Sequence, residues 1–192
     1  MTYKPGCWIC PHRLARIAGL VPVVAVTQAE ADLFDGVGAL QLRSLNGIKE
    51  RSIQAGIDYA NANGIAEGGT RADAVRHAYW NALMVREVGR DKARDLATAH
   101  EQVIGNFQAD EAMDLWNNLQ GREIASSNPA ASDAELLQLA VSAVEAGQMV
   151  VVRDVGSLAW SSSSVGTPLF RPDTPPGAVH DEYGTPYGPV LG

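Results

Sequence analysis

The 192-residue sequence contains little cysteine and no long hydrophobic run, and both shortages exclude kinds of protein. Its two cysteines, Cys7 and Cys10, form one C-x-x-C pair without a second half-site, so a disulfide or a redox pair explains them as well as half of a zinc site does. The apolar stretches 17–26, which Pro22 interrupts, and 136–152 are both shorter than the roughly 18 residues that span a bilayer. We expect no membrane-spanning segment, and no cleaved signal peptide, because no clear small-residue cleavage site follows the first stretch.

Positively charged residues are also fewer than negatively charged ones. The 15 Lys and Arg residues face 22 Asp and Glu residues, which gives a formal net charge of −7. A protein that binds nucleic acid over a broad surface needs the opposite sign, so we expect no nucleic-acid partner. Hydrophobic residues make up 46% of the chain, which is enough to bury a core, and the length favours one domain with an appendage.

Apolar residues recur at intervals of three and four along most of the chain, a pattern that predicts an all-α fold, mainly a helical bundle. Thr70 is a plausible N-cap, Ser132 opens the last helix, and Gly89 and Gly121 read as helix stops. Residues 149–152 are β-branched and form either one short strand or the tail of that helix. The expected helices are two within 28–63 that break at Asn46-Gly47, then 71–88, 92–104, 110–119 and 133–147.

Composition divides the chain into three parts. An N-terminal arm covers 1–27, a helical domain covers 28–160, and a tail rich in Pro, Ser and Gly covers 161–192. The tail holds six of the ten prolines and has little to bury, so we expect it to be irregular and to wrap the domain or dock a partner.

Polar side chains fall on the inward faces of three predicted helices. His77 and Asn81 share a stripe with apolar neighbours, and His100 lies in step with an apolar face, with Glu101 beside it. The third helix carries Asp114, followed three and four residues later by two asparagines. Buried imidazoles and amides need partners, since an unpaired one costs about 1–3 kcal/mol.

One hypothesis is that His77, His100 and Asp114 hold a divalent metal, whose ligands in proteins are commonly imidazole and carboxylate groups. Glu101 would accept a proton from metal-bound water, and the hydroxide would hydrolyse a phosphoester or an acyl bond. The predicted catalytic residues are thus His77, His100, Glu101 and Asp114. The predicted substrate-binding residues are Arg76, Trp80, Asn81, Asn117, Asn118 and Arg122.

A different hypothesis gives the same residues no chemistry. The polar side chains would hydrogen-bond one another to tie the helices together, with Trp80 and Trp116 packed around them. The adjacent pair Asn117 and Asn118 is harder to explain in this way, because asparagines form helices poorly unless they bind something.

The strings DAVRHAYWNALM, AHE and MDLWNN with GREIA, within 65–128, resemble an uncharacterised helical domain of bacterial secreted and toxin-like proteins, including effectors of interbacterial competition. The order His, His-Glu, Asp is also similar to the His, His-Asp, Asp order of helical metal-dependent phosphohydrolases, with Glu101 in place of an Asp. The positions that match the uncharacterised helical domain are Arg76, His77, Tyr79, Trp80, Asn81, His100, Glu101, Asp114, Asn117, Asn118, Gly121 and Arg122.

This resemblance implies an antibacterial effector that is made in the cytoplasm of a producing cell and secreted into a target cell by a type VI apparatus. Its partners would be a cognate immunity protein and a tube or spike component of that apparatus. The leading hypothesis is a metal-dependent hydrolase that acts on a phosphoester-containing envelope component. The alternatives are a membrane-acting toxin, in which 136–152 and 17–26 insert into lipid, and a binding or structural module that uses its tail.

Overall fold

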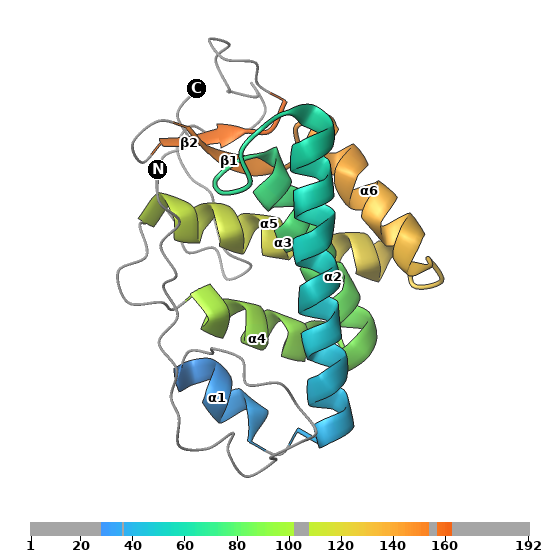
Figure 1. Cartoon of the computed structure of the whole chain (residues 1–192). Helices are drawn as coiled ribbons and strands as arrows, with labels where there is room; N and C mark the ends of the chain where they lie inside the picture. The colour runs from blue at the N-terminus through green and yellow to red at the C-terminus, as the bar shows by residue number, and fades with distance from the viewer. Residues whose placement is uncertain (1–27, 36, 102–107, 154–156, 163–192) are drawn as a thin grey trace.

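The computed structural model describes residues 28–35, 37–101, 108–153 and 157–162, and this part of the chain forms six helices and a two-stranded sheet (Figure 1). The predicted mainly helical fold is confirmed. Cys7, Cys10, the rest of the N-terminal arm and the tail from residue 163 lie outside the described residues. The elements are α1 (Gln28–Phe34), α2 (Ala39–Asn63), α3 (Arg71–Val88), α4 (Arg90–Glu101), α5 (Gln108–Ser127), α6 (Asp133–Glu145), β1 (Val150–Arg153) and β2 (Ser157–Trp160).

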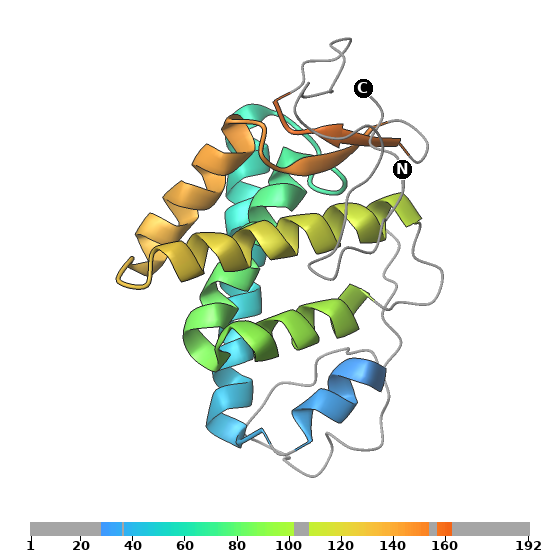
Figure 2. The ribbon, with the colours of Figure 1, turned by 180° about the vertical axis from the view of Figure 1, so that it is seen from behind.

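Helix α3 is the centre of the fold and contacts α2, α4, α5, α6 and β1. Its small buried residues Ala74, Ala78 and Ala82 let the neighbouring helices approach closely. Seen from behind, α4 and α5 run side by side across α2 and α3 (Figure 2). The short helix α1 packs against α4.

Gly121 lies inside α5 and does not end it, so the predicted stop at this residue is wrong. A Cβ atom at Gly121 would lie 2.1 Å from the carbonyl oxygen of Ala78. This glycine is therefore where α3 and α5 touch backbone to backbone, and the packing requirement outweighs its poor helix propensity.

Helix α2 runs without interruption through Asn46-Gly47, so the predicted break there is also wrong. Leu45 and Ile48 on either side of this pair are buried, and the Asn46 side chain donates to Glu50 one turn later. Tertiary packing of this face against the core thus overrides the low helix propensity of the pair.

Local capping signals were predicted correctly. The Thr70 hydroxyl accepts a hydrogen bond from the Ala72 N–H at the start of α3, and Gly89 ends that helix with φ +83°. Ser132 and Glu135 form a reciprocal capping box at the start of α6.

Residues 149–152 were predicted to form either a short strand or the tail of a helix, and the structure shows a strand, β1. β1 pairs with β2 in an antiparallel hairpin, in which Val150 lies opposite Trp160. The N–H of Val152 donates to the carbonyl of Gly69 at 2.8 Å, which joins the hairpin to the loop before α3. The apolar stretch 136–152 is thus divided between α6 and β1. In the ranges that the structure describes, we find no helix with both the length and the apolar character to cross a membrane.

Candidate functional site

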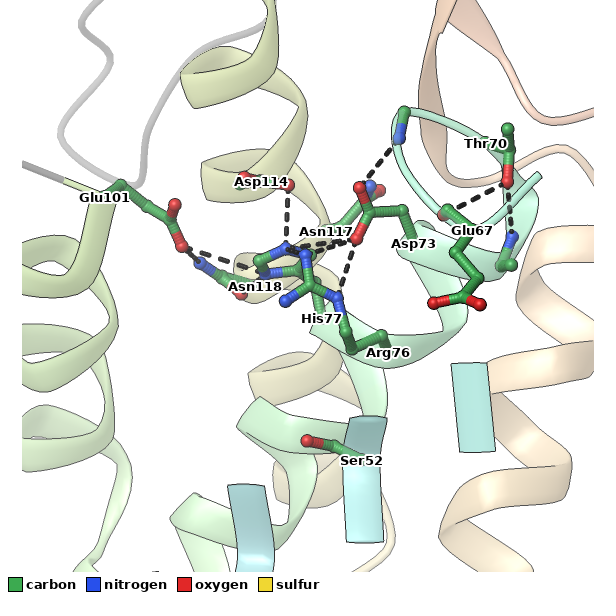
Figure 3. Close-up of polar contacts among 12 residues, drawn as sticks. Ser52, Glu67, Thr70, Asp73, Arg76, His77, Glu101, Asp114, Asn117 and Asn118 are labelled. Atoms are coloured by element: carbon green, nitrogen blue, oxygen red, sulfur yellow. Dashed lines mark hydrogen bonds and ion pairs between the residues drawn. The ribbon is translucent and has the colours of Figure 1, made fainter. Parts of the chain in front are cut away.

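Three buried residues form a group that could hold a metal ion. Asp73 and His77 lie one turn apart on α3, and Asp114 faces them from α5 (Figure 3). One ligand atom from each lies within 4.8 Å of the others. The Nε2 atom of His77 lies 2.9 Å from Asp114 Oδ1 and 3.5 Å from Asp73 Oδ1.

A chain of hydrogen bonds beside this group runs from Arg122 through two asparagines to Glu101. Its donors and acceptors are consistent in only one direction. The guanidinium of Arg122 has only donors, and its NH1 donates to Asn81 Oδ1 at 2.8 Å. The Nδ2 of Asn81 therefore points the other way and donates to Asn118 Oδ1 at 2.5 Å. The Nδ2 of Asn118 in turn donates to Glu101 Oε1 at 3.0 Å. These bonds fix Asn118 Oδ1 as an acceptor.

This direction determines the tautomer of His77. Asn118 Oδ1 lies 3.1 Å from His77 Nδ1, and because the oxygen accepts, Nδ1 carries the hydrogen. The lone pair is then on Nε2, in agreement with the 2.6 Å contact from Arg76 NH2, which can only donate. A metal-binding histidine is oriented in the same way, through a hydrogen bond from its other ring nitrogen.

Asp114 completes a set of acceptors that face one another. Its Oδ1 atom is buried and receives no hydrogen bond. His77 Nε2, 2.9 Å away, has no hydrogen to donate in this tautomer. Lone pairs in contact in a buried site are unfavourable unless a cation lies beside them. In the structure the Arg76 guanidinium supplies that cation for Asp73 and His77, and a metal ion would supply it for all three residues. The donor set thus fits a metal ion.

Asp73 stays ionised although it is buried. Burial by itself would raise the pKa of its carboxyl, but the charge of Arg76 and the hydrogen bonds from the Gly69 N–H and from Arg76 lower it below the ordinary value. Arg76 Nε donates to Asp73 Oδ1 at 2.7 Å, and its NH2 contacts the same oxygen. Burial would lower the pKa of Arg76, and the carboxylates of Asp73 and Asp114 raise it, so the guanidinium remains charged.

The pKa of Glu101 is shifted in the opposite direction to that of Asp73. It is 4% exposed, and burial followed by the charge of Asp114 raises the pKa of its carboxyl well above 4.5. Its Oε1 atom lies 3.8 Å from His77 Nδ1. A buried carboxyl with a raised pKa can donate and accept protons, which suits a general acid or base.

The structure does not bring His100 to the group, in contrast to the predicted metal site. His100 Nδ1 lies 2.8 Å from Glu30 Oε1 on α1, and its ring packs edge-on against Trp80 at 5.0 Å between centroids. Consecutive helical residues point about 100° apart, so only one of His100 and Glu101 can face the group from the end of α4. Glu101 takes that position.

Most predicted substrate-binding residues have internal partners instead. Asn117 holds β1, since its Nδ2 donates to Val150 O at 2.8 Å and its Oδ1 accepts from Val150 N at 3.0 Å. Trp80 is half-buried between the two histidine rings. Asn81, Asn118 and Arg122 form the buried amide chain. Arg76 is different, because its side chain is 35% exposed and lies beside the group.

Asp73 is absent from the residues predicted to bind metal. The available signal is its four-residue spacing from His77, which places both on one helical face. An acidic residue in the first turn of a helix is also favoured by the helix dipole, so its position alone does not indicate a ligand.

The sequence profile of a family described as "Domain of unknown function (DUF6973)" matches residues 41–148. The chain belongs to this family. The DUF6973 segment contains Asp73, His77, Glu101 and Asp114, and it ends just before the hairpin. No curated protein and no solved structure matches the chain. The family description states no activity.

Proposed function

We propose that this protein is a metal-dependent hydrolase whose metal is held by Asp73, His77 and Asp114. The observation that carries the proposal is the buried Oδ1 of Asp114, which receives no hydrogen bond and faces the Nε2 lone pair of His77. One imidazole and two carboxylates suit a divalent transition metal and leave coordination positions for water and substrate. Such an ion lowers the pKa of water and neutralises charge on a phosphoryl oxygen.

The protein's own groups supply the remaining functions. Asn118 and Asn81 orient His77, and Arg122 holds Asn81 in turn. Glu101 moves the proton that hydrolysis requires, because its carboxyl is buried beside His77 with a raised pKa.

A phosphoester is the substrate class that the site favours. Arg76 is a partly exposed guanidinium next to the group, and guanidinium recognises phosphate oxygens through paired hydrogen bonds. The scissile group of an uncharged ester or amide offers no anionic oxygen for this cation, whereas that of a phosphoester does.

The biological setting that we propose rests on the sequence resemblance to toxin-like domains. In this setting the protein is an antibacterial effector, delivered by a type VI apparatus, that attacks an envelope phosphoester and is neutralised by an immunity protein. A producing strain should outcompete recipients that lack the immunity protein, and Asp114→Asn should abolish the advantage. Equal competition by both strains would contradict it.

A structural role for the same residues is the second candidate. Arg76 already pairs with Asp73, and the amide chain from Arg122 to Glu101 is continuous. A network of this kind can align α3 and α5 without any reaction.

Metal analysis separates the two candidates. The full chain is loaded separately with Zn²⁺ and Mn²⁺, dialysed and measured by elemental analysis, and then tested on bis(p-nitrophenyl) phosphate. We expect stoichiometric metal and hydrolysis in the wild type, and loss of both in Asp73→Asn and Asp114→Asn. Asp58→Asn, at an exposed carboxylate of α2 that accepts a hydrogen bond from Gln54, is the matched control. Metal-free wild type, or metal retained by a folded Asp114→Asn, would overturn the proposal in favour of the structural role.

A further inference from the structure

Arg76 occupies the ligand atoms that a metal would need. Its NH2 contacts both Asp73 Oδ1 and His77 Nε2, the latter at 2.6 Å. Both residues belong to the candidate group. The Nε2 atom of an imidazole has a single lone pair, so a guanidinium and a metal ion cannot both use it and each must displace the other there.

The end of the Arg76 side chain has a place to move to. A cavity of about 140 Å³ lies between α2, the loop before α3 and α3 itself, with Arg76 and Asp73 in its wall. Ile53 and Ile57 supply an apolar side, and Glu67 lies on its rim. The volume corresponds to roughly five water molecules, enough for a phosphoryl group.

The base of the same side chain is held in place. Gly56 on α2 packs so closely that a Cβ atom there would lie 3.2 Å from Arg76 Cβ and 3.1 Å from the carbonyl oxygen of Ala72. The backbone and Cβ of Arg76 are therefore fixed between the helices. Beyond Cβ the side chain, which is 35% exposed, is held by its contacts with Asp73 and His77 and can reorient once these are broken.

We infer that metal binding expels the Arg76 guanidinium from Asp73 and His77 into the adjoining cavity, and so creates a phosphoryl-anion site that exists only in the metal-loaded protein. The inference rests on the metal site of the proposed function. Before metal binds, the positive charge of Arg76 is neutralised by Asp73, and the cavity offers an anion mainly the carboxylate of Glu67. Once displaced, the guanidinium faces the cavity beside the metal, and its paired donors meet the phosphoryl oxygens.

The inference predicts opposite effects of one substitution on two ligands. Mn²⁺ affinity is measured by titration calorimetry, and affinity for dimethyl phosphate, a monoanionic phosphodiester, by ³¹P NMR with and without Mn²⁺. Arg76→Gln should bind Mn²⁺ about tenfold more tightly, because its competitor is gone, and the metal-loaded variant should bind dimethyl phosphate about tenfold more weakly. Glu67→Gln should leave Mn²⁺ affinity unchanged and bind the anion more tightly, since it removes a repelling charge.

Controls separate this inference from the proposed function. Arg86→Gln, on the same helix and paired with Asp133, should match the wild type for both ligands. If Arg76→Gln fails to fold, Arg76→Lys, which keeps the charge but lacks the Nε donor to Asp73 and the paired donors of the guanidinium, should show the same two trends more weakly. Equal Mn²⁺ affinity in wild type and Arg76 variants, or equal anion affinity with and without metal, would overturn the inference alone. Absence of binding of both Mn²⁺ and Zn²⁺ in the wild type would overturn both.

Discussion

The Oδ1 atom of Asn118 lies 3.1 Å from the Nδ1 atom of His77 and accepts a second hydrogen bond from Asn81. An oxygen with two donors directed at it leaves Nδ1 as the protonated nitrogen and Nε2 as the candidate ligand atom. A residue on α5 thus decides which nitrogen of a histidine on α3 carries the lone pair beside the two carboxylates.

Removing this oxygen should release the ring. In Asn118→Ala, we expect the Nδ1–H tautomer of His77 to lose its dominance and metal affinity to fall about 10–100-fold, the range typical of residues that orient metal ligands. The imidazole ¹⁵N shifts report the tautomer, and calorimetry reports the affinity. Asn118→Asp retains an acceptor toward Nδ1 and should retain the tautomer. An unchanged His77 tautomer in Asn118→Ala would show that the amide does not set it.

The neighbouring amide is the matched control. Asn117→Ala removes both hydrogen bonds to buried Val150, so we expect the free energy of unfolding to fall by about 2–4 kcal/mol. Metal affinity of the folded variant should stay within about twofold of the wild type, because Asn117 holds the hairpin and not the ligand group. Urea denaturation and calorimetry measure the two quantities.

The two inward histidines should differ in their effect on metal content. His77→Gln removes a ligand and should abolish stoichiometric metal, whereas His100→Gln breaks a contact with Glu30 and should leave it intact. Elemental analysis of both variants, with a thermal melt to confirm folding, makes the comparison. Loss of metal in a folded His100→Gln would restore His100 as a ligand.

The raised pKa of Glu101 makes stability depend on pH. Between 4.5 and its folded pKa, the folded state binds a proton that the unfolded state has lost. The stabilisation is complete below 4.5 and disappears as the pH rises through the folded value. Glu101→Gln mimics the protonated form, so its free energy of unfolding relative to wild type should increase with pH across that window. Urea melts of chelator-treated proteins at a series of pH values test this, and a flat difference would contradict it.

Glu135 supplies a control of opposite sign. Hydrogen bonds from the backbone and hydroxyl of Ser132 lower the pKa of this exposed carboxyl, so its contribution is present above 4.5 and is lost as the pH falls through the folded value. Relative to wild type, Glu135→Gln should therefore be less stable at neutral pH and equal to it in acid.

Two helical glycines should respond to alanine in opposite directions. Gly121→Ala forces a Cβ into the Ala78 carbonyl and should destabilise the fold by about 3 kcal/mol or more, since backbone must shift. Gly47→Ala in α2 meets only the Arg51 guanidinium end at 3.7 Å, so it should stabilise by about 0.5–1 kcal/mol. Chemical denaturation of both variants decides whether contact or propensity controls each position.

Much of the fold was predictable because its signals are local. Thr70 and Ser132 begin their helices where the sequence places them, and apolar spacing identifies the inward faces that carry His77 and Asp114. The same spacing could not choose between His100 and Glu101, since both are near one face and only the position of α1 assigns them. It also missed Asp73, whose role depends on a carboxylate 41 positions away on another helix.

The sequence by itself determined the helices, their caps and the acidic, histidine-containing character of the buried face, because these depend on residues within one or two turns of each other. Only the tertiary structure decided that Gly121 is a contact point, that Asn117 holds a strand while Asn118 orients His77, and that Arg76 occupies the candidate ligand atoms. Those assignments depend on distances between helices. No local sequence pattern encodes these distances, because they are set by the packing of α5 across α3.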